Sequence, residues 1–205
     1  HEDYFEQFSF SLKGKLQIPL LKESYDQLIA RHSILRTCFN DRLGEEILQI
    51  VQSEVPSNFH FTDLSSSDSM SIEAFRQSDR DNEFDLSQGS PMRLNVVYLG
   101  DNIHELIWSN HHIILDGWCL SILIKEFFLI YDGLLANEPV ILNKVKPYAN
   151  YIKWLMNVDK DSSLDYWKTY LAGYDTLTSI SKTTYIDGPY RSGQLNLALE
   201  DSQRS

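Results

Sequence analysis

The sequence predicts an α/β fold of α+β type, in which a mixed sheet is flanked by helices in two layers. Segments that alternate apolar and polar residues recur along the chain, and segments with apolar residues at steps of three and four lie between them. Two long apolar strands are joined by Gly100-Asp101-Asn102, which is typical of a hairpin. At 205 residues, 42% hydrophobic and 23% charged, the chain is long enough and apolar enough to bury a core.

The first third of the chain predicts strands around one helix. Residues 8–14 alternate as a half-buried strand that ends in a glycine turn. After Pro19, apolar residues at helical spacing predict a helix to about Ser33. Short strands follow, separated by the turn around Gly44 and by Pro56, at residues 36–40, 45–52 and 58–64.

The remaining two thirds predict a helix, a hairpin and further helices. Ser and Asp residues before Ile72 cap a helix that runs to about Asn82. The later elements are strands at 92–99 and 103–110, an apolar helix from 118 to about 131, aromatic-rich helices near 147–157 and 162–172, and a strand at 194–199. We see no repeat and no low-complexity linker.

Charge and cysteine usage exclude several classes. The net charge of −11 repels nucleic acid and anionic membrane surfaces, so we expect neither as a partner. Cys38 and Cys119 lack the spacing of a disulfide framework or a structural zinc site, which favours a cytoplasmic protein. The most apolar stretch, 119–130, contains Lys125 and Glu126 and is too short to span a membrane. No secretory signal is visible, and we expect an excised fragment.

The segment SNHHIILDGW (109–118) departs from the pattern of a core. A predicted strand runs into two adjacent histidines, then Asp-Gly, then a helix, and such strand ends often carry catalytic groups. Because side chains alternate along a strand, His111 and His112 should point to opposite faces. A zinc site would need both rings and Asp116 to converge, so we expect no metal.

A neutral imidazole is the side chain best suited to accept or steer a proton near pH 7. Gly117 permits the backbone angles of a tight turn into the next helix. A buried Asp116 needs a partner, and arginine satisfies a carboxylate with two donors. The candidates, each in otherwise apolar sequence, are Arg31, Arg36 and Arg93.

Structural roles remain open for most of these residues. The histidines can be core or surface residues, and Arg31 and Arg36 can be helix-end and surface charges. A buried, inert thiol is the favoured role of Cys119. Core packing is the favoured role of the aromatic residues Trp108, Phe127, Phe128, Tyr148, Tyr151 and Trp154.

Four motifs, in the same order, resemble those of the condensation domains of non-ribosomal peptide synthetases. HHIILDGW is similar to the HHxxxDG signature of these domains, and RHSILRTCF (31–39) to their RHxxLRTxF segment. FDLSQGSPMRLNVVYL (84–99) and YANYIKW (148–154) are similar to FDLxxxPLxRxxL and YxDYxxW. These domains are part of the chloramphenicol-acetyltransferase-like superfamily, so the resemblance implies a lobe of that fold.

The chain also departs from the family pattern. The Ser-x-x-Gln-x-Arg segment is absent upstream of residue 8. Asn150 replaces the Asp of the YxDYxxW motif, and Cys119 occupies the position after DGW where Ser is common. Family domains are about twice as long, and the motifs of their second half are missing. The resemblance therefore implies an N-terminal lobe at 1–175 and, at 176–205, the start of a connection to a missing second lobe.

The resemblance implies acyltransferase-type amide bond formation in antibiotic biosynthesis. Donor and acceptor substrates are carried on the phosphopantetheine arms of peptidyl carrier proteins, and no cofactor is bound directly. His112 would act as the base or would position the amine, Gly117 would help to hold an oxyanion, and Asp116 would pair with Arg31 or Arg36.

His111 would be structural. The adenylation domain and the C-terminal lobe would be further partners, and the fragment alone would be inactive. Two alternatives stay open: an epimerization domain of the same assembly lines, and a catalytically silent module that docks carrier proteins.

Overall fold

The computed structural model describes residues 4–40, 47–66 and 70–176. The chain divides into two compact units, His1–Val158 and Asp159–Ser205. The first unit holds both sheets and all but one of the helices in the described part of the chain. In the second unit the structure describes one helix, α5 (Lys160–Tyr170), which begins at the side-chain cap of Asp159.

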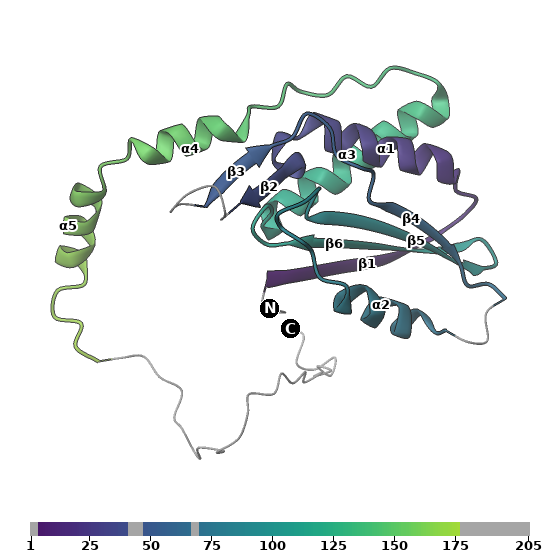
Figure 1. Cartoon of the computed structure of the whole chain (residues 1–205), viewed down its shortest axis with the longest axis horizontal. Helices are drawn as coiled ribbons and strands as arrows, with labels where there is room; N and C mark the ends of the chain where they lie inside the picture. Colours follow the sequence, from purple (N-terminus) through teal and green to yellow (C-terminus); the bar gives the residue numbers. More distant parts are fainter. Residues whose placement is uncertain (1–3, 41–46, 67–69, 177–205) are drawn as a thin grey trace, which may run out of the picture. The chain divides into compact units, whose positions relative to one another are not determined.

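A mixed four-stranded sheet organises the first unit, as the sequence predicted (Figure 1). The strand order is β1-β6-β5-β4, in which β4 runs parallel to β5 and the other neighbours are antiparallel. The bounds are β1 Phe5–Lys13, β4 Phe59–Asp63, β5 Met92–Gly100 and β6 Ile103–His111. A separate antiparallel pair is formed by β2 (Thr37–Asn40) and β3 (Leu48–Val51).

Helices lie on both faces of the sheet. Figure 1 shows α1 (Ile18–Arg31) and α3 (Gly117–Ala136) together on one face and α2 (Ile72–Asp81) on the other. A short 3-10 helix, η2 (Ser33–Arg36), links α1 to β2, and α4 (Tyr148–Met156) follows α3.

The β5–β6 connection is the predicted hairpin. Asp101 and Asn102 have φ angles of 51° and 57°, the left-handed backbone that a two-residue hairpin turn requires and that Asp and Asn tolerate well. The ladder shifts register between Tyr98 and Gly100, next to this turn. The hairpin fixes β6, and therefore fixes where the strand delivers His111 and His112.

The apolar core lies between the sheet and the α1/α3 layer. Leu94 and Trp108 lie opposite each other on neighbouring strands, and Trp108 meets Phe127 of α3 edge to face at 5.6 Å between ring centroids. Trp108 and Phe127 are fully buried, which confirms their expected core role, and Phe128 is partly buried against the same cluster. Burial of a side chain of this size contributes about 1.5–3 kcal/mol, so this layer stabilises the strand that carries the histidines.

The opposite face is polar where α2 meets it. Asp79 of α2 is buried and accepts hydrogen bonds from Arg93 Nε at 2.6 Å and from Asn95 Nδ2 at 2.8 Å. Gln7 Nε2 donates to the same carboxylate at 2.7 Å, and Ser109 Oγ donates as well. A network of hydrogen bonds to one carboxylate thus joins α2 to β1, β5 and β6.

Several predicted elements differ in extent. The apolar helix continues past residue 131 to Ala136, where Asn137 adopts a left-handed cap conformation with φ 55°. Of the strand predicted at 45–52, the structure has Leu48–Val51, and residues 45–46 lie outside the described residues, as does the predicted strand at 194–199.

The expected core role of the α4 aromatics is wrong. The exposed fractions of Tyr148, Tyr151 and Trp154 are 39%, 48% and 62%, although the three rings follow one another along one side of the helix at 5.6 and 5.7 Å. Helical spacing identified the shared side but not whether another element covers it.

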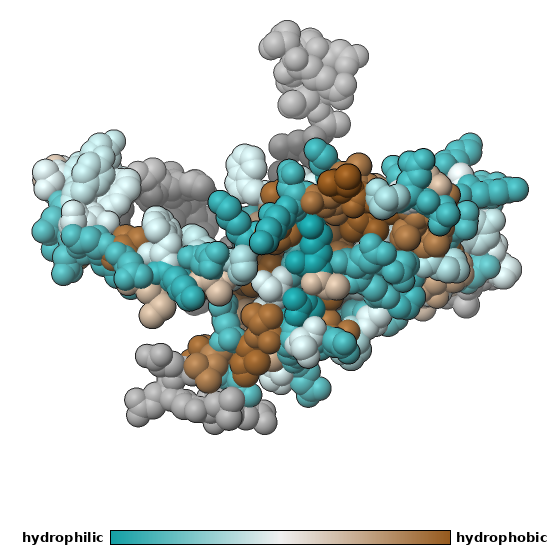
Figure 2. All heavy atoms as spheres, turned by 90° about the horizontal axis from the view of Figure 1, so that it is seen from above, coloured by the Kyte–Doolittle hydropathy of each residue, from teal (hydrophilic) through white to brown (hydrophobic). Residues whose placement is uncertain are grey.

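On the face of the molecule seen from above, apolar side chains gather in patches between hydrophilic ones (Figure 2). Across the described ranges, no helix has the length and apolarity needed to cross a membrane.

Candidate functional site

The two histidines lie where β6 ends, and the backbone there is held from both sides. The His111 amide donates to the Pro91 carbonyl at 3.0 Å, next to β5, and the His112 amide donates to the Tyr4 carbonyl at 2.8 Å, next to β1. Because consecutive amides are bound to opposite neighbours, the backbone position of this pair is well defined. The His112 ring nevertheless remains accessible, with 44% of its side-chain surface exposed.

His112 faces the carboxylate of Glu6. Its Nδ1 lies 3.2 Å from Glu6 Oε1, and the second carboxylate oxygen accepts from Asn110 Nδ2 at 3.3 Å. An ionised carboxylate only accepts hydrogen bonds, so this contact favours a hydrogen on Nδ1. In the neutral ring, Nε2 then has a free lone pair, which is the state that a proton acceptor requires.

His111 belongs to the other face and has different neighbours. Its Nδ1 accepts from the Ile113 amide at 3.0 Å, and its ring lies 6.0 Å from that of Tyr4. His111 also lines a cavity of about 360 Å³, together with Phe5 and Phe84. Burial, and then the charge of His112, lower the pKa of His111. The two rings therefore do not converge on one ligand, and the described residues contain no group of three His, Cys, Asp or Glu placed to hold a metal ion.

Asp116 caps helix α3. Its backbone is extended, with φ −119° and ψ 175°, and its Oδ1 accepts from the Cys119 amide at 2.9 Å. Hydrogen bonding from Cys119, through its side chain and then its backbone, lowers the pKa of Asp116, and the charge of His112 lowers it further. The charge of His112 thus reaches the Asp116 carboxylate, but the contacts of that carboxylate are those of a helix N-cap.

The expected ion pair between Asp116 and an arginine is wrong. Arg31 donates from Nε to Glu126 at 2.9 Å and from Nη2 to the Asn143 carbonyl. Arg36 donates to the carbonyls of Gln52 and Ser53.

Arg93, the third candidate, binds Asp79 on the α2 face. Asp116 has no arginine partner among the described residues because of where it lies in the fold. Asp116 begins α3 in an exposed turn, where backbone amides satisfy its carboxylate, so it is not the buried charge that would require a guanidinium.

Gly117 is the first residue of α3, and its φ is not in the left-handed region. Gly117 was expected to permit the backbone angles of a tight turn, but the structure does not use that freedom at this position. A Cβ on Gly117 would meet nothing within 4 Å, so the space in front of this residue is open. Beside it, Cys119 is partly buried, and burial raises the pKa of its thiol, as expected of an inert cysteine.

Glu6 and Glu126 are the site residues that sequence reasoning missed. Glu126 accepts from Arg31 and lies 2.6 Å from His32 Nε2, so it joins the RHSILRTCF segment to α3. Burial opposes ionisation of Glu126, but hydrogen bonds from Arg31 and His32 outweigh it and lower its pKa. Glu126 could have been identified from the sequence, because it is a charged residue inside an apolar helical stretch. Glu6 acquires its position only from the β1–β6 register, which the sequence did not predict.

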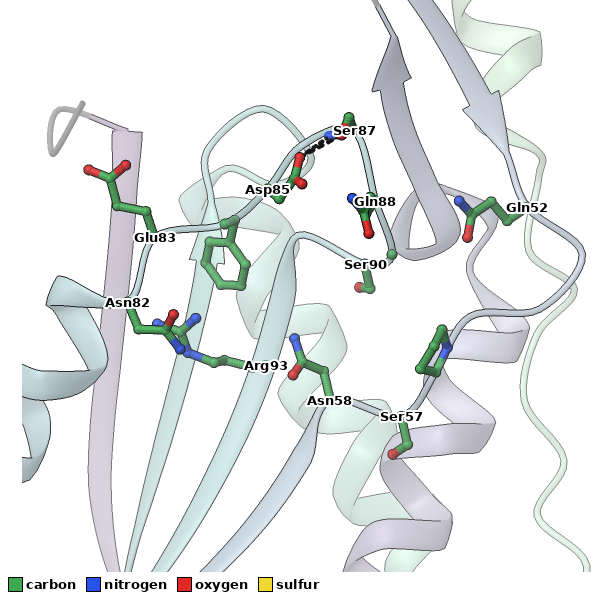
Figure 3. A pocket seen from close by; sticks show the side chains of 13 residues that line it. Gln52, Ser57, Asn58, Asn82, Glu83, Asp85, Ser87, Gln88, Ser90 and Arg93 are labelled. Atoms are coloured by element: carbon green, nitrogen blue, oxygen red, sulfur yellow. Dashed lines mark hydrogen bonds between the residues drawn. The ribbon is translucent and has the colours of Figure 1, made fainter.

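A polar cavity shares Phe84 with the cavity that His111 lines. It encloses about 570 Å³ and is lined by the 82–90 segment together with Gln52, Asn58 and Arg93. Figure 3 shows amide and hydroxyl side chains around it and the hydrogen bond within its wall between Asp85 and Ser87. His112, Asp116 and Gly117 are not among its lining residues, so the size of this cavity does not make it the reaction site.

The family model of the condensation domain matches residues 1–203, and the chain therefore belongs to the condensation-domain family. Bacitracin synthase 1 from Bacillus licheniformis is 36% identical over 86% of this chain, and gramicidin S synthase 2 from Brevibacillus brevis is 36% identical over 90%. Surfactin synthase subunit 3 from Bacillus subtilis (strain 168) is 35% identical over 87%. The chain spans 3%, 4% and 14% of these three proteins.

Solved structures share the fold. The starter condensation domain of rhizomide synthetase RzmA matches with a TM-score of 0.75 at 14% identity, over 85% of this chain and 43% of that one. The epimerization domain from the third module of tyrocidine synthetase B matches with a TM-score of 0.76 at 19% identity, over 90% and 43%. The fold is therefore that of condensation domains, which is the chloramphenicol-acetyltransferase-like fold that the resemblance implied.

Proposed function

We propose that this chain is the N-terminal lobe of a peptide-synthetase condensation domain, in which His112 serves amide bond formation. Residues 1–175 would form the lobe, and residues 176–205 would begin the connection to a second lobe. The observation that carries the proposal is the exposed His112 ring on a fixed backbone, with Nδ1 3.2 Å from the Glu6 carboxylate.

The proposed reaction joins two carrier-bound substrates. The amine of the acceptor attacks the thioester carbonyl of the donor, so that a C–N bond forms, the C–S bond breaks and the donor thiol leaves. One proton must leave the amine nitrogen. Nε2 of His112 is suited to accept it, or to orient the amine by a hydrogen bond while the departing thiolate takes the proton.

The residues around His112 take supporting roles. The Gly117 amide lies in the first turn of α3, where amides lack intrahelical acceptors and the helix dipole favours negative charge, so it suits a developing oxyanion. Asp116 would hold this turn through its cap, and His111 would fix the end of β6. Arg31 and Arg36 would be structural, because they tie α1 and η2 to neighbouring segments.

The substrates would reach the site on phosphopantetheine arms of donor and acceptor peptidyl carrier proteins. A thioester is already activated, so amide formation needs no further cofactor bound to this lobe. An adenylation domain and the C-terminal lobe would be the other partners, in a cytoplasmic assembly for antibiotic synthesis. Because the reacting amine and thioester would meet between two lobes, we expect the 205-residue chain alone to fold without catalysing.

An epimerization domain is the second candidate. The fold match to the tyrocidine synthetase epimerization domain is as good as that to the starter condensation domain. The residue after Gly117 is Trp118, followed by Cys119, whereas epimerization domains of this family usually carry Ser-Trp there. An assay of α-proton exchange on a carrier-bound aminoacyl group separates the two, because a condensation domain does not catalyse it.

The decisive experiment compares two histidine variants in the full-length synthetase that contains this chain. His112→Ala should lower the rate of peptide formation by at least about 100-fold, the usual effect of losing a general acid-base group. His60→Ala is the matched control, because His60 is an exposed histidine on β4 that contacts Asn58, and it should leave the rate unchanged. Wild-type turnover by His112→Ala would instead support a silent carrier-docking module.

A further inference from the structure

We propose that Glu6 is a positioning residue for His112: it holds the imidazole in the Nδ1–H tautomer and turns the Nε2 lone pair toward the acceptor amine. The inference rests on the proposed function, since it assigns a role in that reaction. Its structural half, the tautomer, can be tested without any turnover.

The register of the β1–β6 pair places Glu6 beside His112. Glu6 lies directly opposite Asn110, and His112 is two residues further along the chain, so Glu6 and His112 are diagonal neighbours. Long side chains reach one another across such a diagonal. The hydrogen bond from the His112 amide to Tyr4 extends the pairing beyond the last strand residue, which keeps the two side chains together.

The Glu6 carboxylate is held at its other oxygen. Asn110, which is 2% exposed, donates to Oε2 and leaves Oε1 for His112 Nδ1. A buried amide therefore fixes one end of the carboxylate, and the imidazole meets the other. The carboxylate and the ring are both about half exposed, with 45% and 44% of their side chains accessible, so a substrate can still approach the ring.

The other charged groups near His112 already have partners. The Asp116 carboxylate accepts from the Cys119 amide, and the His111 Nδ1 accepts from the Ile113 amide. Glu6 is therefore the acidic group in ion-pair contact with the His112 ring among the described residues.

The adjacent histidines should consequently carry their protons on opposite nitrogens. His111 accepts at Nδ1, so its neutral form is Nε2–H, whereas His112 places Nδ1 3.2 Å from a carboxylate, which favours Nδ1–H. The neutral imidazole of free histidine favours Nε2–H. Without Glu6, the His112 ring should return toward that form, in which the exposed nitrogen can no longer accept a proton.

The first test measures the ring nitrogens of the 205-residue chain by ¹⁵N NMR, above the pH at which the rings are protonated. The wild type should show Nδ1–H for His112 and Nε2–H for His111. Glu6→Ala should move His112 toward Nε2–H and leave His111 unchanged. Glu6→Gln, which keeps the size and can donate to Nδ1, should do the same, while the exposed control Glu23→Gln should change neither ring. An Nε2–H signal for His112 in the wild type would overturn the inference.

The second test measures kinetics in the full-length synthetase. Glu6→Ala and Glu6→Gln should lower kcat by about 10-fold or more with little change in KM, because a wrong tautomer removes the acceptor and leaves binding intact. Glu6→Asp should recover part of the loss. If His112→Ala abolishes turnover but both Glu6 variants keep the wild-type kcat, the positioning role is refuted and the proposed function stands. If the His112→Ala variant forms peptide at the wild-type rate, both the positioning role of Glu6 and the proposed function are refuted.

Discussion

Replacement of Asp79 should destabilise the first unit more than any surface substitution. Its buried carboxylate accepts from Arg93 and from three further side chains on β1, β5 and β6. Asp79→Ala removes all four contacts at once. Arg93, which is 4% exposed, then keeps, among the residues that the structure describes, the backbone carbonyl of residue 79 and the rings of Phe5 and Phe84 at 5.4 and 4.6 Å.

The expected loss in unfolding free energy follows from leaving the buried Arg93 charge without its carboxylate partner. Breaking a buried ion pair by removing one partner costs about 3–5 kcal/mol. The remaining carbonyl and ring contacts place the expected loss near the lower end of this range, at about 3 kcal/mol. A domain of this kind is stable by only about 5–15 kcal/mol in total, so the loss is a large fraction of it.

Urea denaturation followed by tryptophan fluorescence measures the loss, since Trp108 is buried in this unit. Asp81→Ala is the matched control, because Asp81 is an exposed acid on the same helix that accepts only from Gln77, and it should change the unfolding free energy by less than about 0.5 kcal/mol. Asp79→Asn with Arg93→Met should recover stability relative to Asp79→Asn alone, because no charge is left buried. A loss below about 1 kcal/mol for Asp79→Ala would refute the reasoning.

Two further predictions concern the site and its strand. Asp116→Ala should lower the urea midpoint while Asp116→Asn retains it, because asparagine also caps a helix; equal losses would indicate that the charge, and not the cap, matters. Burial lowers the pKa of His104 below its ordinary 6.5, despite a hydrogen bond with the Asn102 backbone. The unfolded chain therefore binds the proton first, so the unfolding free energy should fall as the pH drops from about 7.5 to about 5.5, with His111 contributing in the same direction, and His104→Gln should flatten this slope.

Local patterns predicted most of the fold because they depend on near neighbours. Alternation located β5 and β6 to within one residue, since an Asp-Asn turn flanked by apolar runs has few other solutions. The end of α3 was missed because Asp132 and Gly133 interrupt the apolar pattern, although the helix continues to its Asn137 cap. The exposure of α4 could not be read from its spacing, which is the same for a covered and an uncovered face.

The places of the motif residues in the fold were predicted, but their contacts were not. The motif placed His112 and Asp116 at a strand end and a helix start, where they are found. The partner of Asp116 was wrong because a carboxylate in Asp-Gly-Trp has two local options, an arginine from elsewhere or the amides of the following helix. The helix amides lie within three residues, and this proximity decides the outcome.

The hairpin explains why the end of β6 would suit the proposed chemistry. This central strand has β1 on one side and β5 on the other, so its last amides bind both neighbours and leave the histidine backbone little freedom. A helix or a loop at that point would lack one of these restraints. What stays free is the rotation and tautomer of the His112 ring, and that is the freedom which the Glu6–Asn110 pair restricts. A residue in the first strand can therefore govern the reactivity of a histidine more than one hundred positions later, because β-pairing makes them diagonal neighbours.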